Sequence, residues 1–187
     1  MRLFIGIALA QEAADTLRRV RDRLAPAGGE LRWSAEESWH VTLQFLGAAS
    51  AEQAACVMEQ LGEVRSAPVP MRLDGVGFFE RAGVFHAGVD LTPGLLALQQ
   101  RVTAATRLCG FLPEERAYHP HITLARAKGR HGPGALAPLK KTLEKFRLVV
   151  HAEFLASEFL LYESIPRPEG SRYEVRARFP FTAEEAP

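Results

Sequence analysis

A four-residue pattern that occurs twice constrains the fold of this chain more than any other feature. His40-Val41-Thr42-Leu43 recurs 81 residues later as His121-Ile122-Thr123-Leu124. Side chains two positions apart on a β-strand share a face. Each strand is therefore predicted to carry a histidine and a threonine on one face and apolar residues on the other. If the two strands lie side by side about a pseudo-twofold axis, both histidines and both threonines converge in one cleft.

The rest of the chain alternates between strand-like and helix-like patterns. Short apolar runs rich in β-branched and aromatic residues indicate strands, and apolar residues spaced three and four apart indicate helices. Capping residues agree with the boundaries, because Ser50 and Thr92 can begin helices and Gly110 can end one. The predicted helices cover 11–24, 51–64, 93–108 and 136–145, and the predicted strands cover 3–9, 31–33, 40–46, 68–79, 83–90, 121–127, 148–154, 158–163 and 173–181.

This order of elements predicts an α+β fold with antiparallel sheets. The chain has neither the G-x-G-x-x-G fingerprint nor a P-loop, which disfavours dinucleotide-binding and nucleoside-triphosphatase folds. A length of 187 residues fits one domain spanning 1–187, and residues 182–187 are expected to form a flexible tail. With 47% hydrophobic and 24% charged residues, a packed core is expected rather than disorder.

Charge and cysteine content set limits on the partners and the compartment. The formal net charge of +1 argues against an extensive basic coat for nucleic acid, although a local basic patch remains compatible with it. No apolar stretch reaches the roughly 20 residues that cross a bilayer, and the first 15 residues are a poor signal peptide. A soluble cytoplasmic protein is expected. Cys56 and Cys109 are too few for a disulfide scaffold or a cysteine-based zinc site, and they are interpreted as small core residues.

The paired histidines and threonines suit chemistry at phosphorus. Imidazole has an ordinary pKa near 6.5, so one histidine can donate a proton while the other accepts one at neutral pH. The hydroxyls of Thr42 and Thr123 can hydrogen-bond the non-bridging oxygens of a phosphate. No metal is needed for this chemistry, and neither motif has a carboxylate or cysteine cluster beside it. No metal and no cofactor are therefore predicted.

The two motifs resemble the HxTx tetrads of the 2H phosphoesterase superfamily. The wider context is similar to its RNA 2′,3′-cyclic phosphodiesterase branch, also called 2′-5′ RNA ligase. The matching stretches are RLFIGIAL at the start, WHVTLQFLG, HPHITLARAK, and LYES followed by RYEV near the end. The resemblance implies two pseudo-symmetric lobes, each an antiparallel sheet with flanking helices, and an active-site cleft between the lobes.

The resemblance also implies a reaction and the roles of individual residues. A terminal 2′,3′-cyclic phosphate of RNA would be hydrolysed to a 2′-phosphate. His40 would be the proton donor and His121 the proton acceptor, and Thr42 and Thr123 would hold the phosphate. The implied partners are RNA 3′ ends or related nucleotides, not a membrane, and a monomer is expected.

Arg126 is the next candidate for phosphate binding. The family often has an arginine after its second motif, and a guanidinium suits phosphate geometry. Arg126 lies five residues after His121, which places it on the opposite face of a regular strand. It reaches the cleft only if the strand ends or bulges near Ala125; otherwise it is a solvated charge at a strand end.

Aromatic and basic residues near the motifs give weaker signals. Trp33, Trp39 or Phe45 could stack on a terminal base. Strand parity favours the core for Phe45, and Trp39 fits either the rim of the cleft or the core. A basic segment could hold an RNA backbone or simply be a solvated surface; its members are Arg126, Lys128, Arg130, Lys140, Lys141, Lys145 and Arg147. His86, His131 and His151 have no motif around them and are interpreted as structural or surface residues.

Two other functions remain open on the sequence. The same site could join RNA ends through a 2′-5′ linkage, because by microscopic reversibility one site catalyses both directions. Alternatively, the chain could bind nucleotides or RNA ends with little turnover. Binding alone does not require two imidazoles, which favours the enzyme.

Overall fold

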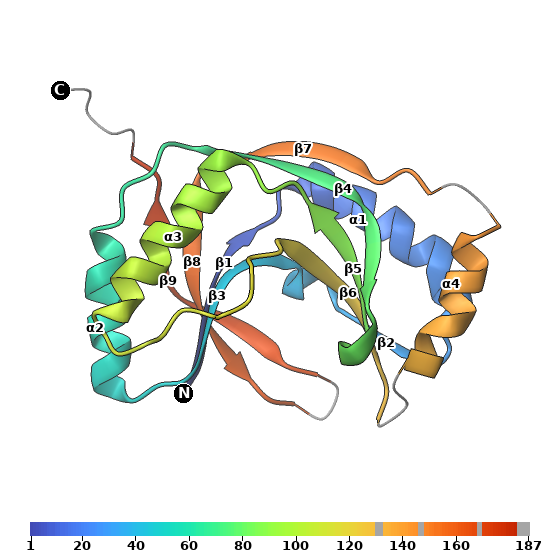
Figure 1. Cartoon of the computed structure of the whole chain (residues 1–187), viewed down its shortest axis with the longest axis horizontal. Coiled ribbons are helices and arrows are strands. Elements are labelled where there is room, and N and C mark those ends of the chain that lie inside the picture. Colours follow the sequence, from blue (N-terminus) through green and yellow to red (C-terminus); the bar gives the residue numbers. More distant parts are fainter. Residues whose placement is uncertain (130–132, 146–147, 168–169, 183–187) are drawn as a thin grey trace.

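The computed structural model of the chain describes residues 1–129, 133–145, 148–167 and 170–182 (Figure 1). Within these residues two antiparallel sheets form two lobes, as predicted. The first sheet has four strands in the order β3-β1-β8-β9, and the second has five in the order β2-β6-β5-β4-β7. The outermost residues of the predicted C-terminal tail, 183–187, lie outside the described residues.

The elements follow the sequence patterns closely. The helices are α1 (Gln11–Leu24), α2 (Ala51–Gly62), α3 (Pro93–Arg107) and α4 (Ala137–Leu143). The strands are β1 (Arg2–Ala8), β2 (Leu31–Trp33), β3 (His40–Ala48), β4 (Val69–Phe79), β5 (Val84–Val89), β6 (His121–Ala127), β7 (His151–Ala156), β8 (Glu158–Ile165) and β9 (Arg172–Pro180).

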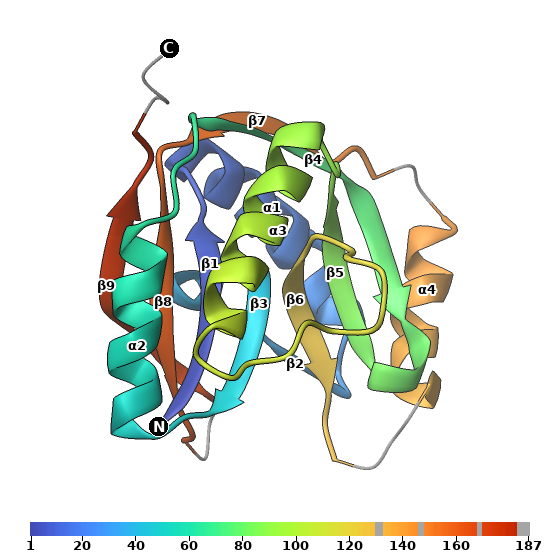
Figure 2. The same cartoon turned by 60° about the vertical axis from the view of Figure 1, so that its left-hand side comes forward.

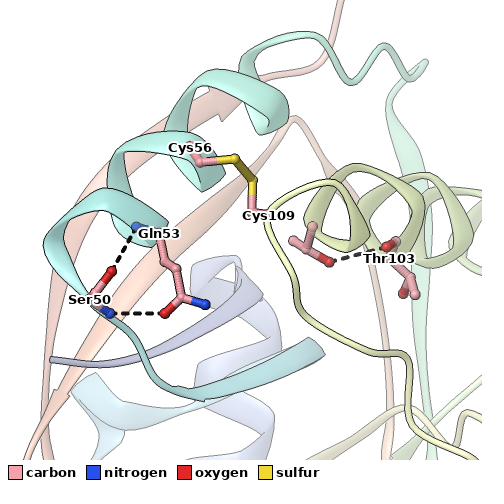
Figure 3. Close-up of a disulfide and its surroundings, with 6 residues drawn as sticks. Ser50, Gln53, Cys56, Thr103 and Cys109 are labelled. Carbon is pink, nitrogen blue, oxygen red and sulfur yellow. Dashed lines mark hydrogen bonds between the residues drawn. A yellow bond between two sulfur atoms is a disulfide. The ribbon is translucent and has the colours of Figure 1, made fainter.

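Capping residues explain where two of the helices begin. The Ser50 hydroxyl accepts a hydrogen bond from the Gln53 amide, and the Gln53 side chain accepts one from the Ser50 amide, which is a complete capping box (Figure 3). Thr92 caps α3 in the same way through the amide of Leu95, with Pro93 at the first helical position. Both caps were predicted from the sequence.

The helices that the structure describes flank the sheets and leave one face of the first sheet uncovered by helix. Helices α2 and α3 contact each other, and α3 contacts both β3 and β4, so it joins the two lobes (Figure 2). The main core collects the inward apolar residues of both sheets, such as Ile5, Val41 and Ile122. Phe4, Leu160 and Tyr162 form a second small cluster on the opposite face of the first sheet. No helix within the described residues is long and apolar enough to cross a membrane.

The two cysteines form a bond that was not predicted from the sequence. Cys56 on α2 and Cys109, just after α3, form a disulfide with their Cα atoms 5.8 Å apart (Figure 3). Cys109 is buried in the main core and Cys56 packs against it, in agreement with the interpretation from the sequence. Their 53-residue separation carried no signal for pairing, and only the side-by-side packing of α2 and α3 brings them together.

Candidate active site

The strands that carry the two motifs lie next to each other at the junction of the lobes. Strand β3 is one of the two edge strands of the first sheet, and it contacts β6 of the second sheet (Figure 2). His40 and His121 begin β3 and β6 respectively. The hydroxyl of Tyr118, in the connection before β6, donates a 2.9 Å hydrogen bond to the carbonyl of Thr42 and ties the lobes together.

Both strands bulge at the same place relative to their motif. Gly6 pairs with Thr42 and Ile5 with Gln44, so Leu43 is the extra residue in β3. His86 pairs with Thr123 and Phe85 with Ala125, so Leu124 is the extra residue in β6. Each bulge reverses the strand's parity for the residues that follow. As a result, the first six residues of the two strands have the same burial pattern. The histidine and the threonine are partly buried, the residue between them and the two after the threonine are buried, and the sixth residue is exposed.

The bulges decide where two candidate residues lie. Arg126 is brought to the cleft side, because the required irregularity near Ala125 occurs at Leu124. Phe45 occupies the matching position five residues after His40, and its side chain is 55% exposed. The prediction that Phe45 belongs to the core was therefore wrong, since that prediction assumed a regular strand. Its ring lies 5.9 Å from that of Phe4, on the same face as His40.

His40 and His121 are each held by an equivalent hydrogen bond to a backbone carbonyl two residues earlier. Nδ1 of His40 lies 2.7 Å from the carbonyl oxygen of Ser38, and Nδ1 of His121 lies 2.8 Å from that of His119. A carbonyl oxygen only accepts, so Nδ1 carries the proton in each neutral ring. Nε2 is therefore the nitrogen that can accept a proton. In His40 it lies 3.1 Å from the Thr42 hydroxyl, which donates to it.

Aromatic rings pack around His40 and shield its imidazole from much of the solvent. The ring centre of Phe4 is 4.6 Å away, that of Tyr173 is 5.2 Å away, and that of Tyr162 is 5.8 Å away. Gly6 gives His40 this position, because a Cβ there would lie 2.9 Å from the Val41 carbonyl and 3.3 Å from the imidazole. Burial lowers the pKa of His40 to about 4, although the Ser38 hydrogen bond opposes it.

His121 has a similar but more open environment. Burial lowers its pKa below the ordinary value, and the positive charge of Arg126 adds to this effect. Charges on His121 and Arg126 also contribute to the lowered pKa of His40, so the three groups act on one another. The lowered pKa therefore favours the neutral form of both imidazoles in the free protein.

His86 is a third imidazole near the site, although no motif surrounds it in the sequence. Its ring centre lies 5.4 Å from that of His121, and Phe79 stacks on it at 4.2 Å. Gly77 leaves room for it, since a Cβ there would lie 2.8 Å from the His86 ring. Strand pairing is what brings His86 to this position, because it pairs with Gly77 on β4 and with Thr123 on β6.

The remaining candidates divide between core, cleft and surface. Trp39 is 5% exposed and packs in the core, whereas Trp33 is half-buried and lines a cavity beside His40. The basic segment is not one surface at the cleft. Lys140 pairs with Glu80, and its helix α4 lies at the outer end of the second lobe (Figure 1). Arg130, His131 and Arg147 lie outside the described residues. No cluster of three or more metal-binding side chains is found in the described ranges.

Comparison with known proteins places this arrangement in a family. The sequence profile described as LigT like Phosphoesterase matches residues 7–86 and 89–173, which include both motifs. The chain belongs to this family. An Aeropyrum pernix protein named RNA 2′,3′-cyclic phosphodiesterase is 33% identical over 169 residues, covering 86% of this chain and 94% of its own length. A Thermotoga maritima protein of the same name is 29% identical over 180 residues, covering 94% and 92% of the two chains.

Solved structures of LigT-like phosphoesterases have the same fold. The crystal structure of E. coli LigT with 3′-AMP superposes with a TM-score of 0.78 at 27% identity, covering 97% of this chain and 98% of that one. The same E. coli protein has also been crystallised with ATP. The α+β fold expected from the order of elements and the two lobes implied by the family resemblance are thus confirmed, and the chain is a member of a phosphoesterase family.

Proposed function

We propose that this chain hydrolyses the 2′,3′-cyclic phosphate at an RNA 3′ end to a 2′-phosphate. The observation that carries the proposal is the matched pair of imidazoles: in each ring a backbone carbonyl binds Nδ1, so that Nε2 is the nitrogen that can exchange a proton. The relatives named RNA 2′,3′-cyclic phosphodiesterase and the nucleotide complexes of E. coli LigT support the substrate class.

The proposed step is an in-line displacement at phosphorus. Nε2 of His121 takes a proton from water while the water oxygen forms its bond to phosphorus. The bond from phosphorus to O3′ breaks on the opposite side, and O3′ takes the proton held on Nε2 of His40. This leaves a 2′-phosphate and a free 3′-hydroxyl, with His121 protonated and His40 neutral. Solvent then restores the starting protonation.

The other candidate residues act on the charge of the phosphate. The hydroxyls of Thr42 and Thr123 share a face with the histidines and are proposed to donate to the non-bridging oxygens. Arg126, brought to the cleft by the bulge at Leu124, adds a positive charge for the phosphate. His40 is neutral in the free protein, so the bound anion is proposed to raise its pKa and supply the protonated donor.

The test is a product analysis in EDTA. Wild-type protein is incubated with a short RNA ending in a 2′,3′-cyclic phosphate, beside His40→Ala, His121→Ala and, as a matched control, His151→Ala on the exposed strand β7. We expect a 2′-phosphate product and a loss of at least about 10²-fold in kcat/KM for the first two variants only. Binding without turnover would point to a binding module instead.

We further propose that the protein acts as a monomer in the cytoplasm, because one copy supplies both histidines and both threonines. Size-exclusion chromatography tests the monomer. Cell fractionation tests the location, and this test is needed because disulfides such as Cys56–Cys109 are less common in the cytoplasm than in oxidising compartments.

A further inference from the structure

A cavity of about 630 Å³ opens beside His40, between the two lobes. One wall is β2 with the segment that follows it, and the other is the start of β9 with the residues before it. Ser38, whose carbonyl holds His40, and Tyr173, whose ring packs edge-on against His40, both line it. Two residues that contact the proposed donor thus also line the cavity.

The cavity, which we call the arginine groove, carries an excess of positive charge. Arg32, Arg126, Arg167 and Arg172 line it, against one acidic residue, Glu37. Among the described residues Arg32, Arg126 and Arg167 form no ion pair, and Arg172 has only an exposed contact of 3.5 Å with Glu174. The Arg32 guanidinium extends across the groove, since a Cβ on Gly170 would lie 3.8 Å from its Cζ atom. These guanidinium groups remain available to bind an anionic ligand.

The direction of the proposed reaction indicates which part of the RNA lies on this side. Water attacks from the His121 side, so the leaving O3′ and the ribose that carries it lie on the His40 side of phosphorus. The RNA chain continues from C5′ of that same ribose. The next phosphate upstream must therefore leave the cleft past His40, where Tyr173 and the arginine groove are found.

We propose that the arginine groove binds the RNA strand upstream of the cyclic phosphate, with Arg32 and Arg172 contacting the penultimate phosphate. This inference rests on the proposed function and on its donor assignment. Its consequence is a substrate preference: an oligonucleotide with a cyclic end is favoured over a nucleoside 2′,3′-cyclic phosphate, which has no upstream phosphate.

The experiment compares two substrates on the same proteins. Adenosine 2′,3′-cyclic phosphate and a tri-adenylate ending in the same cyclic phosphate are assayed with wild type, Arg32→Gln, Arg172→Gln and the double variant. Lys141→Gln on α4 is the matched control for loss of one positive charge. The readout is the ratio of kcat/KM for the trinucleotide to that for the mononucleotide, which cancels any common loss from misfolding.

We expect a wild-type ratio of at least about 10, falling roughly threefold to fivefold for each arginine removed, as for partly exposed ion pairs. The ratio should be unchanged in Lys141→Gln. The salt dependence of trinucleotide binding should weaken by about 0.7 in log–log slope for each phosphate that an arginine no longer neutralises. A wild-type ratio near one, or a ratio that the double variant leaves unchanged, would overturn the inference while leaving the proposed function standing.

A different outcome separates the two proposals. If wild type turns over neither substrate, the proposed function is wrong. Fluorescence anisotropy of a labelled tri-adenylate ending in a 2′-phosphate then tests, independently of turnover, whether the arginine groove binds RNA. A Kd that rises in the double variant and not in Lys141→Gln supports the groove, and equal Kd values refute it.

Discussion

Binding of a phosphate anion is predicted to convert His40 from a neutral ring to a charged proton donor. In the free protein, burial among Phe4, Tyr162 and Tyr173 lowers its pKa to about 4. Relative to an ordinary value near 6.5, this favours the neutral ring by about 3 kcal/mol. At pH 7, on the order of one molecule in a thousand therefore has a charged His40.

The negative charge of the substrate's phosphate is large enough to reverse the lowering of the His40 pKa. A unit negative charge about 4 Å from an imidazolium contributes about 4 kcal/mol at an effective dielectric constant of 20. That interaction offsets the cost of burial, so the pKa of His40 in the complex should rise by roughly 2 to 3, to between 6 and 7. The enzyme would then acquire its acid only when a phosphate is present to receive the proton transfer.

The measurement is a titration of the imidazole resonances by NMR, with and without saturating nucleoside 2′-phosphate. His40→Ala identifies the resonance of His40. An unliganded pKa near 6.5 would refute the argument from burial. A low value that does not rise in the complex would refute the role of the anion, and with it the assignment of His40 as donor.

Three other perturbations test the charges of the site and the disulfide. Arg126→Gln removes a positive charge that lowers the pKa of both His40 and His121, so both limbs of the kcat/KM profile should move to higher pH; limbs that stay in place would separate Arg126 from the site. Because the folded-state pKa of His40 is depressed, the unfolded chain binds the proton first, and stability falls as pH drops below about 6.5. Between pH 7 and pH 4.5 the free energy of unfolding, measured in urea, should fall by about 2.5 kcal/mol less in His40→Gln than in wild type. Equal decreases in the two proteins would contradict the depressed pKa. Removing the Cys56–Cys109 bridge with a double serine variant should lower the free energy of unfolding by about 4 kcal/mol, because the bridge closes a chain segment of 53 residues; a change below about 1 kcal/mol in urea would refute that account.

Local signals in the sequence were sufficient for the elements and for the paired motif. The two tetrads identify their own strands, because alternation of polar and apolar residues has a period of two. Ser50 and Thr92 mark helix starts through hydrogen bonds made within four residues, so no tertiary information is needed. Repetition of the pattern was also enough to predict that two histidines and two threonines converge in one cleft.

The tertiary structure alone decided what depends on register and on contacts between distant segments. The bulges at Leu43 and Leu124 are set by pairing with β1 and β5; they expose Phe45 on the face that carries His40 and turn Arg126 toward the cleft. The position of His86 beside His121, the Cys56–Cys109 bridge and the arginine groove all join residues from different elements. A periodic pattern indicates which face of a strand is apolar. It does not indicate where a bulge interrupts the strand, because that depends on the partner strand with which it pairs.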